Sequence, residues 1–150
     1  MLVYSPYVEA GATDDVSLAK HFVEALNAKD VDAMMRMTAS PFRLRDQKWE
    51  TAKDGYGFVL GKSADRTVSG TRDRRQLLSE IVAKVHVSKP ESGNPLAKTD
   101  DAWKHVVKAP PESLAKLRFI VFTRGEADVE HLAIVGIQPR TQKIAFLYVN

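Results

Sequence analysis

Asp46 is the residue in this sequence that most directly suggests chemistry. Its neighbours alternate with a period of two, so Asp46 shares one face of an extended segment with Phe42 and Leu44. The opposite face carries Arg43, Arg45, Gln47 and Trp49. A carboxylate on an apolar face is costly unless it is paired or used, which makes Asp46 a candidate catalytic residue. The alternative is an ion pair with Arg43, Arg45 or Lys48 in solvent at the end of a hairpin.

Two histidines lie in apolar stretches. His131 alternates with small and aliphatic residues from position 133 to 137, and His86 lies between two valines. An imidazole in a pocket lined by a sheet can act as a base or hold a ligand, so His86 and His131 are candidate ligand-binding residues. The usual alternative for such a histidine is a hydrogen-bonded residue of the core or its rim.

Metal and thiol chemistry have no support in the sequence. The four histidines are far apart, without a His-x-His or HExxH pattern, and the chain has no cysteine. These features exclude thiol nucleophiles, disulfides and cysteine-ligated metals. We therefore expect no metal ion and no cofactor.

Positive charge is concentrated between residues 43 and 75, where nine Lys and Arg residues accompany five acids. Trp49, with Tyr56 and Phe58 across an expected turn, is the group there that could stack on a base. Because acids interleave the basic residues and the whole chain carries a net charge of only +3, nucleic acid is not the expected partner. We expect Trp49 and Tyr56 instead to shape a ligand cavity. Residues 57–63 resemble a phosphate-binding loop, but the spacing of their glycines does not fit that motif.

Composition indicates one ordinary globular domain. Of the 150 residues, 44% are hydrophobic and 27% are charged, and a chain of this length can bury a core of its own. No segment approaches the ~20 apolar residues of a membrane span, and Met1 to Ala12 lack the features of a signal peptide. We therefore expect a cytoplasmic protein without membrane association.

The order of expected elements is typical of an α+β protein. Apolar residues at helical spacing predict a helix that begins after Thr13, Asp14 and Asp15, and a second, short helix capped by Asp30. A third helix is expected from Thr71, with an apolar stripe from Leu77 to Val85. Strands are expected at 42–49, 56–60, 117–124, 129–138 and 143–149, with a further strand beginning at 85–88 and a loop at 61–70.

We expect residues 1–150 to form a single domain with two appendages. Residues 1–12 would be an N-terminal arm, and residues from about 89 to 115 would be an insertion with a short helix at 99–108. Two helices, a hairpin, a third helix and a run of strands do not alternate as in a parallel α/β protein. The expected fold is therefore α+β, with helices on one face of a mostly antiparallel sheet.

The segment from Phe22 to Met34, with the sequence FVEALNAKDVDAM, resembles the opening of the nuclear transport factor 2-like superfamily. Ala39 to Phe42, leading into the first strand, extends the resemblance, which covers most of the chain outside residues 1–12 and about 89–115. It implies a cystatin-like fold in which a curved, mostly antiparallel sheet wraps around three main helices and forms a conical pocket. It also implies a homodimer, but no single reaction.

Members similar to ketosteroid isomerase hold a base on the first strand, and Asp46 is the matching residue. Tyr56 or Tyr148 could supply the hydrogen bond that stabilises an enolate oxygen, although no spacing singles them out. Members similar to limonene epoxide hydrolase use an Asp-Arg-Asp arrangement, for which Asp65 with Arg66, or Arg72 with Asp73, offer only neighbouring residue types. The resemblance thus implies a SnoaL-like isomerase, cyclase or hydrolase with a carboxylate base.

Two functional hypotheses follow from these observations. In the first, a small, largely apolar molecule binds between sheet and helices in a closed, mostly apolar cavity with Asp46 as base, shaped by Trp49, Tyr56, His86 and His131. The basic segment 43–75 would then lie at the pocket mouth and favour an anionic ligand. In the second, the chain is a non-catalytic module that dimerises or binds a partner through a sheet face, because Phe119 to Phe122 are apolar on both faces.

Overall fold

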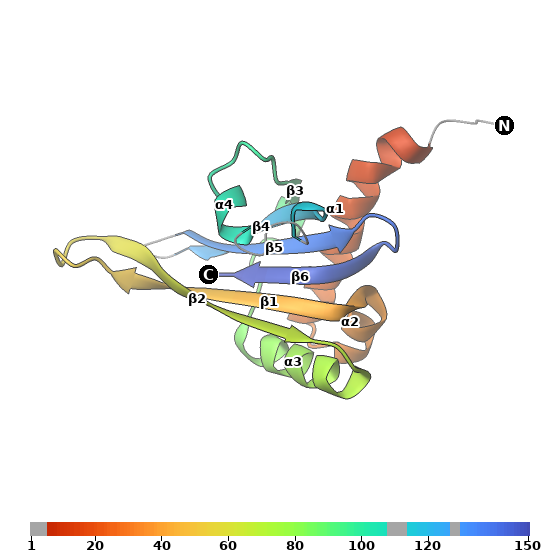
Figure 1. Cartoon of the computed structure of the whole chain (residues 1–150), viewed down its shortest axis with the longest axis horizontal. Coiled ribbons are helices and arrows are strands. Elements are labelled where there is room, and N and C mark those ends of the chain that lie inside the picture. The colour runs from red at the N-terminus through yellow and green to blue at the C-terminus, as the bar shows by residue number, and fades with distance from the viewer. Residues whose placement is uncertain (1–5, 108–113, 127–129) are drawn as a thin grey trace.

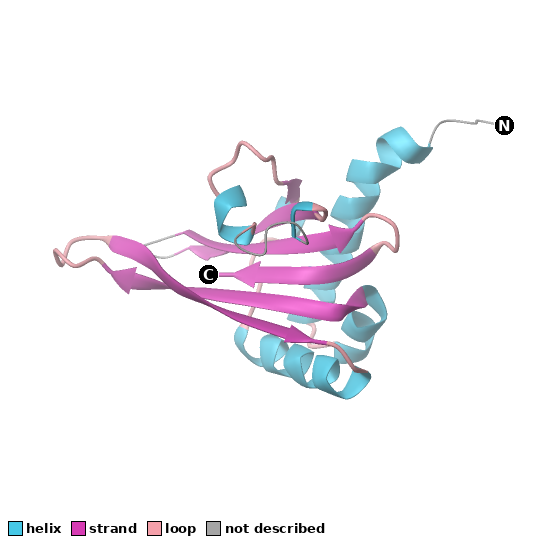
Figure 2. Cartoon of the chain, viewed as in Figure 1, coloured by secondary structure: helices cyan, strands magenta, loops and turns pink. Residues whose placement is uncertain are grey.

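A computed structural model describes residues 6–107, 114–126 and 130–150. Helices α1 (Pro6–Asn27) and α2 (Val31–Met37) are followed by the hairpin β1 (Thr38–Thr51) and β2 (Phe58–Val68) and by helix α3 (Thr71–Lys84). After a short 3-10 turn, η1 (Pro90–Ser92), come β3 (Asn94–Pro95), α4 (Trp103–Val106), β4 (Arg118–Glu126), β5 (Glu130–Gln138) and β6 (Lys143–Val149). The predicted α+β class with three main helices and a mostly antiparallel sheet is confirmed (Figure 2).

The six strands form one sheet in the order β2-β1-β6-β5-β4-β3. Every neighbouring pair is antiparallel except β1 and β6, which are parallel because the chain crosses from one to the other by way of α3 and the remaining strands. The sheet is curved and open, and α1, α2 and α3 lie on one side of it (Figure 1). We call this side the inner face and the opposite side the outer face.

The main hydrophobic core lies on the inner face. Phe22, Val23 and Leu26 of α1 and Leu77, Leu78 and Ile81 of α3 are buried against it. The sheet contributes alternate residues from four strands, among them Phe42, Leu44, Leu147, Val135 and Phe122. This packing explains the helical stripes of the sequence, since each apolar stripe meets the apolar face of the sheet.

The turn between α1 and α2 follows the prediction. Asp30 caps α2, because its carboxylate accepts a hydrogen bond from the backbone N–H of Ala33 at 3.1 Å. Lys29 before it adopts a left-handed conformation with φ of 58°.

The beginning of α1 differs from the prediction. The helix begins at Pro6, so the described part of the expected arm, residues 6–12, is helical and Thr13 to Asp15 lie inside the helix. Proline is well accommodated in a first helical turn, where its missing N–H has no intrahelical partner to lose. Residues 1–5 lie outside the described part of the chain.

The expected loop at 61–70 is wrong, because β2 runs from Phe58 to Val68. From residue 61 to 67 this edge strand is polar and mostly exposed, so it lacks the apolar alternation that marks a half-buried strand. The cap of α3 also differs: Gly70 occupies the cap position and Thr71 is the first helical residue.

The expected strand at 85–88 is absent, and these residues form an extended connection. Asn27 holds it in place, because its side-chain amide donates to the carbonyl oxygen of Val87 at 2.9 Å and accepts from the Val87 N–H at 2.8 Å. A side chain of α1 thereby satisfies the backbone groups that a neighbouring strand would otherwise pair.

The described residues of the segment expected to be an insertion, 89–107 and 114–115, cover the outer face with a second hydrophobic cluster. Val106 and Leu96 pack there against Phe119, Phe146 and Tyr148 of the sheet. Gly136 leaves room for this packing, because a Cβ at this position would lie 2.9 Å from both the Phe119 ring and the Phe146 Cβ. Within the predicted helix at 99–108, only Trp103–Val106 is α-helical, and residues 108–113 lie outside the described part of the chain.

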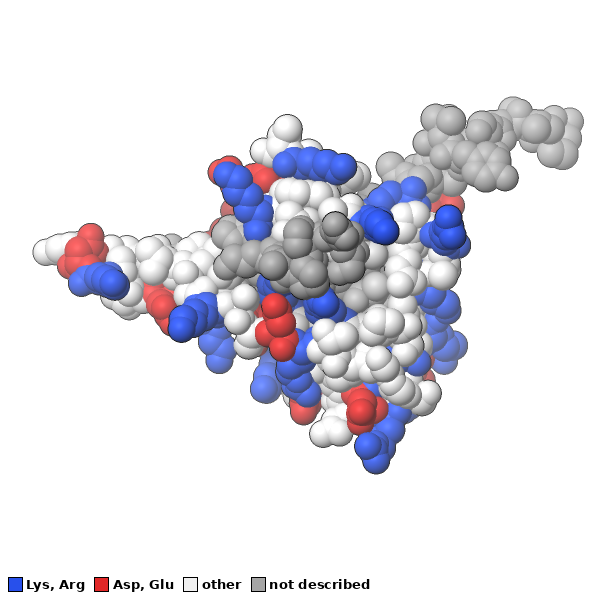
Figure 3. Space-filling view, viewed as in Figure 1, with Lys and Arg blue, Asp and Glu red and all other residues white. Residues whose placement is uncertain are grey.

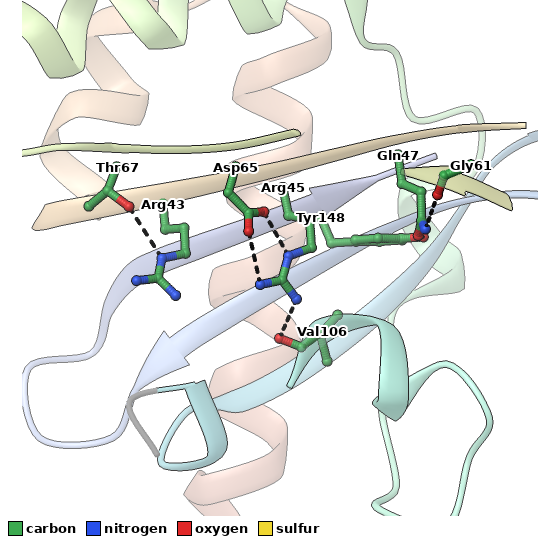
Figure 4. A network of polar contacts seen from close by, with 8 residues as sticks. All are labelled: Arg43, Arg45, Gln47, Gly61, Asp65, Thr67, Val106 and Tyr148. Carbon is green, nitrogen blue, oxygen red and sulfur yellow. Dashed lines mark hydrogen bonds and ion pairs between the residues drawn. The ribbon is translucent and has the colours of Figure 1, made fainter. Parts of the chain in front are cut away.

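Arg45 is buried beneath the insertion and connects it to the sheet (Figure 4). Its guanidinium forms an ion pair with Asp65 at 2.8 Å, donates to the carbonyl oxygen of Val106 at 3.1 Å and lies 5.8 Å from the centre of the Phe146 ring. Two positions along the strand, Arg43 makes the matching but exposed contact with Thr67 Oγ1. The cation therefore satisfies polar groups that the insertion and β2 bring to the outer face.

Replacing Asp65 with alanine should lower the free energy of unfolding by about 2 kcal/mol, because the Arg45 guanidinium stays buried and loses its carboxylate. Thr67→Ala is the matched control on the same strand, since it removes only the exposed hydrogen bond to Arg43 and should cost less than about 0.5 kcal/mol. Urea unfolding measures both. Equal losses for the two variants would contradict the role assigned to Arg45.

Asp15 provides a second test, in the contact between α1 and β4. Its carboxylate is 2% exposed and lies 2.7 Å from Nε of Arg118. Burial raises the pKa of Asp15 above its ordinary value of 3.8 and outweighs the opposing effect of Arg118, and Asp14 adds to the rise. Protonation of Asp15 therefore favours the folded state.

The contribution of Asp15 to stability is complete below the unfolded-state pKa and is lost as the pH rises through the higher folded-state value. Relative to Asp15→Asn, which is neutral at every pH, the wild-type protein should gain stability when the pH falls from about 7 to about 4. Urea unfolding at both pH values measures this difference. Asp14→Asn, at an exposed neighbouring position, is the control, and a difference between wild type and Asp15→Asn that does not change with pH contradicts the prediction.

Candidate functional site

A cavity of about 530 Å³ lies between the inner face of the sheet and α3. Its volume is within the range of sites that hold small organic molecules. The apolar residues that line it are Leu44, Trp49, Ala64, Leu77, Ile81, Val85 and Val149. The polar and charged residues that line it are Asp46, Gln47, Lys48, Arg66, Glu80, Lys84, Arg124, His131 and Asn150.

The strand register explains why residues far apart in the sequence meet here. Asp46 pairs with Val149, Val149 with Ala133 and Ala133 with Phe122, so these four residues form one row across the sheet. The row comes from four strands, β1, β6, β5 and β4, and lies at one end of the sheet. Asp46 therefore lies on the inner face at the level of Ala133 in β5 and of Phe122 in the middle of β4.

Arg124 is brought to the cavity by a β-bulge in β4. Thr123 pairs with Leu132 and Gly125 with His131, which leaves Arg124 as an extra residue in the ladder. Such a bulge bends a strand and redirects a side chain, and bulges often accompany functional sites. The sequence offers no signal for the bulge, because the expected strand 117–124 has Arg124 as its last residue in regular alternation.

Asp46 lies in the cavity wall, as the alternation from Phe42 predicts, and is partly buried. Among the residues that the structure describes, no hydrogen bond or ion pair involves its carboxylate. The expected alternative of an ion pair with Arg43, Arg45 or Lys48 is wrong: the two arginines bind Thr67 and Asp65 on the outer face, and no ion pair among the described residues joins Asp46 to Lys48. The Asp46 carboxylate is therefore available to a molecule in the cavity.

The charge of Asp46 affects the pKa of Arg124, which lines the same cavity. Burial lowers the pKa of Arg124 below its ordinary value, and the negative charge of Asp46 partly opposes this effect. Its Nη1 donates to the main-chain oxygen of Asn150, whereas its Nε is buried without a hydrogen-bond partner in the described structure. An unsatisfied buried donor is costly, so this wall gains hydrogen bonding if Arg124 turns toward an acceptor in the cavity.

His131 also lines the cavity and is half-buried. Its Nδ1 lies 3.0 Å from the main-chain oxygen of Asn150, the atom that also accepts from Arg124. His131 of β5 and Arg124 of β4 thus both contact the main-chain oxygen of Asn150.

Of the remaining candidates, Trp49 lines the cavity and the other two do not. Trp49 presents its side chain to the wall with Nε1 buried and unpartnered in the described structure. Tyr56 is 83% exposed in the turn between β1 and β2, because the two strands of this hairpin extend beyond the body of the molecule (Figure 1). His86 is exposed in the connection after α3, because Asn27 turns Val87 rather than His86 inward.

Tyr148, the other tyrosine considered as a hydrogen-bond donor, faces the outer side of the sheet. Its hydroxyl donates to Gln47 Oε1 at 2.6 Å and is buried in the second hydrophobic cluster (Figure 4). Burial raises the pKa of Tyr148 above its ordinary value of 10.0, while hydrogen bonding from Asn150 and the charge of Arg45 oppose the rise. The hydroxyl therefore stabilises the end of the sheet.

The cavity is more polar than the sequence predicted. Four cations line it, Lys48, Arg66, Lys84 and Arg124, against the two acids Asp46 and Glu80. Arg66 forms an ion pair with Glu80, which leaves Lys48, Lys84 and Arg124 as the cations of the cavity lining without an ion pair in the described structure. Two of these, Lys48 and Lys84, are exposed at the rim, so the cavity opens to solvent through a positively charged edge.

Only part of the basic segment 43–75 lies at this rim. Its side chains alternate between the two faces of the β1–β2 hairpin, and others belong to α3. Lys48 and Arg66 reach the cavity, Arg43 and Arg45 lie on the outer face, and Arg74 and Arg75 bind α2. On the face shown in Figure 3, Lys and Arg are scattered among acids and uncharged residues rather than aligned in a track.

The described residues contain no group of three or more His, Cys, Asp or Glu that could hold a metal ion. None of the described helices is long and apolar enough to cross a membrane.

Comparison with known proteins yields a similarity of fold. No protein-family model matches the chain, and no curated protein sequence does. Among solved structures, an NTF2-like protein from Burkholderia xenovorans LB400 is similar, with 13% sequence identity and a TM-score of 0.49 over 93% of this chain and 89% of that chain. At this identity the likeness concerns the fold, so no residue role or activity is transferred from it.

Asp46→Asn should change the free energy of unfolding by less than about 0.5 kcal/mol, because no hydrogen bond of the described residues depends on the carboxylate. Urea unfolding measures this, with Asp65→Asn as a control in which a carboxylate that holds Arg45 is lost. A loss of about 2 kcal/mol or more for Asp46→Asn would show that Asp46 is a structural residue.

Proposed function

We propose that this protein binds a small amphipathic molecule with an anionic group in the cavity between the sheet and α3. The observation that carries the proposal is the meeting of Asp46, Arg124 and His131 from three strands at one end of a cavity with an apolar wall. Leu77, Ile81 and Leu44 form the buried apolar part of the cavity lining, and the partly exposed Trp49 and Val85 offer a surface for an apolar body. The excess of cations at the rim favours an anion at the open side.

Asp46 is the residue that would take up a proton if the protein is an enzyme. Its carboxylate lies in the cavity wall without a hydrogen-bond partner among the described residues, and the nearby Arg124 is positioned to stabilise developing negative charge on a ligand. This arrangement fits proton abstraction next to a carbonyl group, as in an isomerase or cyclase. An Asp-Arg-Asp hydrolase fits less well, because Asp65 faces the outer side and Arg72 with Asp73 is exposed at the start of α3.

The alternative, a dimerisation or partner-binding module, loses part of its basis. It relied on a sheet face left open at Phe119 to Phe122. Ile120 and Phe122 are buried in the main core, whereas Phe119 packs under the insertion against Trp103 at a centroid distance of 5.2 Å. The chain thus covers both faces of this segment itself. Size-exclusion chromatography with light scattering would measure whether a homodimer forms elsewhere.

The proposed ligand class can be tested with phenylacetate and its neutral amide, phenylacetamide. Phenylacetate should shift the amide NMR signals of β1, α3 and β5, and should bind at least about fivefold more tightly than the amide. Arg124→Gln should weaken phenylacetate binding by about tenfold, since a charge-assisted hydrogen bond is lost.

Arg72→Gln is the matched control, because Arg72 is exposed at the start of α3 and away from the cavity wall. Binding should also weaken when NaCl is raised to about 0.5 M. Equal affinity for the acid and the amide, or binding that salt leaves unchanged, would contradict an anionic ligand. The absence of any shift along the cavity wall with either probe would contradict the site.

A further inference from the structure

The contact between His131 and Asn150 determines which imidazole nitrogen carries the proton. Nδ1 of His131 lies 3.0 Å from the main-chain oxygen of Asn150. A main-chain oxygen has no hydrogen to donate, so the imidazole must be the donor and Nδ1 must be protonated. In the neutral ring, Nε2 then carries the lone pair and can only accept a hydrogen bond.

The oxygen of Asn150 is held in place independently of His131. The Asn150 side chain accepts from the Leu132 N–H at 2.7 Å, and the Asn150 N–H donates to the Leu132 carbonyl oxygen at 3.2 Å. Arg124 donates to the same main-chain oxygen from the other strand. Because these contacts fix the acceptor, the sheet imposes the protonation of Nδ1 rather than adapting to it.

His131 therefore differs from the other polar groups of the cavity wall. Lys48, Lys84 and Arg124 can only donate hydrogen bonds, and Asp46 is an acceptor that carries a negative charge near Arg124. A neutral acceptor at the beginning of β5 is matched by a hydroxyl or N–H group, and an oxygen without a hydrogen at that point leaves Nε2 unsatisfied.

We infer that Nε2 of His131 selects ligands that carry a hydroxyl or N–H group in addition to their anionic group, so that the ligand class is small hydroxy or amino acids with an apolar body. This inference rests on the proposed function. His131 acts as a specificity-determining residue whose tautomer is set by the main-chain oxygen of Asn150.

The tautomer can be measured without any ligand. Long-range ¹H–¹⁵N NMR correlations of the full chain at about pH 8.5, above the range in which ordinary histidines titrate, distinguish the two nitrogens. We expect Nδ1 of His131 to be protonated and Nε2 to be bare. A His131 protonated at Nε2 would overturn the inference.

Ligand selection can be measured with para-hydroxyphenylacetate and para-methoxyphenylacetate. The first has a hydroxyl group that can donate a hydrogen bond to Nε2, whereas the second has a methoxy group that cannot. The wild-type protein should bind the hydroxy acid about fivefold more tightly, and in His131→Asn this ratio should fall to about one. Asparagine can still donate to the Asn150 oxygen through its amide but has no atom in the place of Nε2, so the fold is retained. His86→Gln is the control and should keep the wild-type ratio.

The outcomes separate this inference from the proposed function. Equal affinity of the wild-type protein for the two acids overturns the inference that His131 selects the ligand, and leaves the proposed function standing. An unchanged ratio of the two affinities in His131→Asn, with the unfolding midpoint preserved, has the same consequence. Absence of any effect of both acids on the His131 signals also overturns the inference. The proposed function fails separately, if phenylacetate leaves the signals of β1 and α3 unchanged.

Discussion

The double pairing of β1, with β2 on one side and β6 on the other, is the constraint on which the rest of the structure depends. It places Asp46 opposite Val149 and Arg45 opposite Tyr148, and because successive residues of a strand point to opposite faces, the two charges are separated by the sheet. A shift of one residue in this register would send Asp46 beneath the insertion and Arg45 into the main core. The cavity and the outer-face network therefore require the same register.

Each face of the sheet is completed by a different part of the chain. The inner face is covered by α1 and α3 except at one end, where Asp46 and Val149 line the cavity. The outer face is covered by Leu96, Val106 and their neighbours, with Arg45 satisfying polar groups at the margin. Packing thus stabilises the sheet on both sides, while incomplete packing at one end leaves a space lined by groups that can bind a ligand.

The bulge at Arg124 and the Asn150 oxygen that Arg124 and His131 share are what make that space chemically distinctive. Without the extra residue in β4, the side chain at position 124 would not be redirected at the row that contains Ala133 and Val149. Without the fixed oxygen, the imidazole could protonate at either nitrogen. The chemistry of the cavity is thus a property of strand ends and ladder irregularities, which local sequence patterns do not encode.

The sequence by itself determined the α+β class, the two apolar helix stripes, the Asp30 cap, the three C-terminal strands and the inward position of Asp46, because each depends on periodicity or on chemistry within a few residues. It assigned Trp49 and His131 to the cavity, but it also assigned Tyr56 and His86 there. The sequence neighbours of these two residues are apolar as well, so the sequence does not distinguish them from Trp49 and His131. Only the tertiary structure decided that β2 is a polar edge strand, that the insertion covers the outer face, and that Arg124 and His131 meet at Asn150. These features depend on which distant residues become neighbours, and a single sequence carries no record of that pairing.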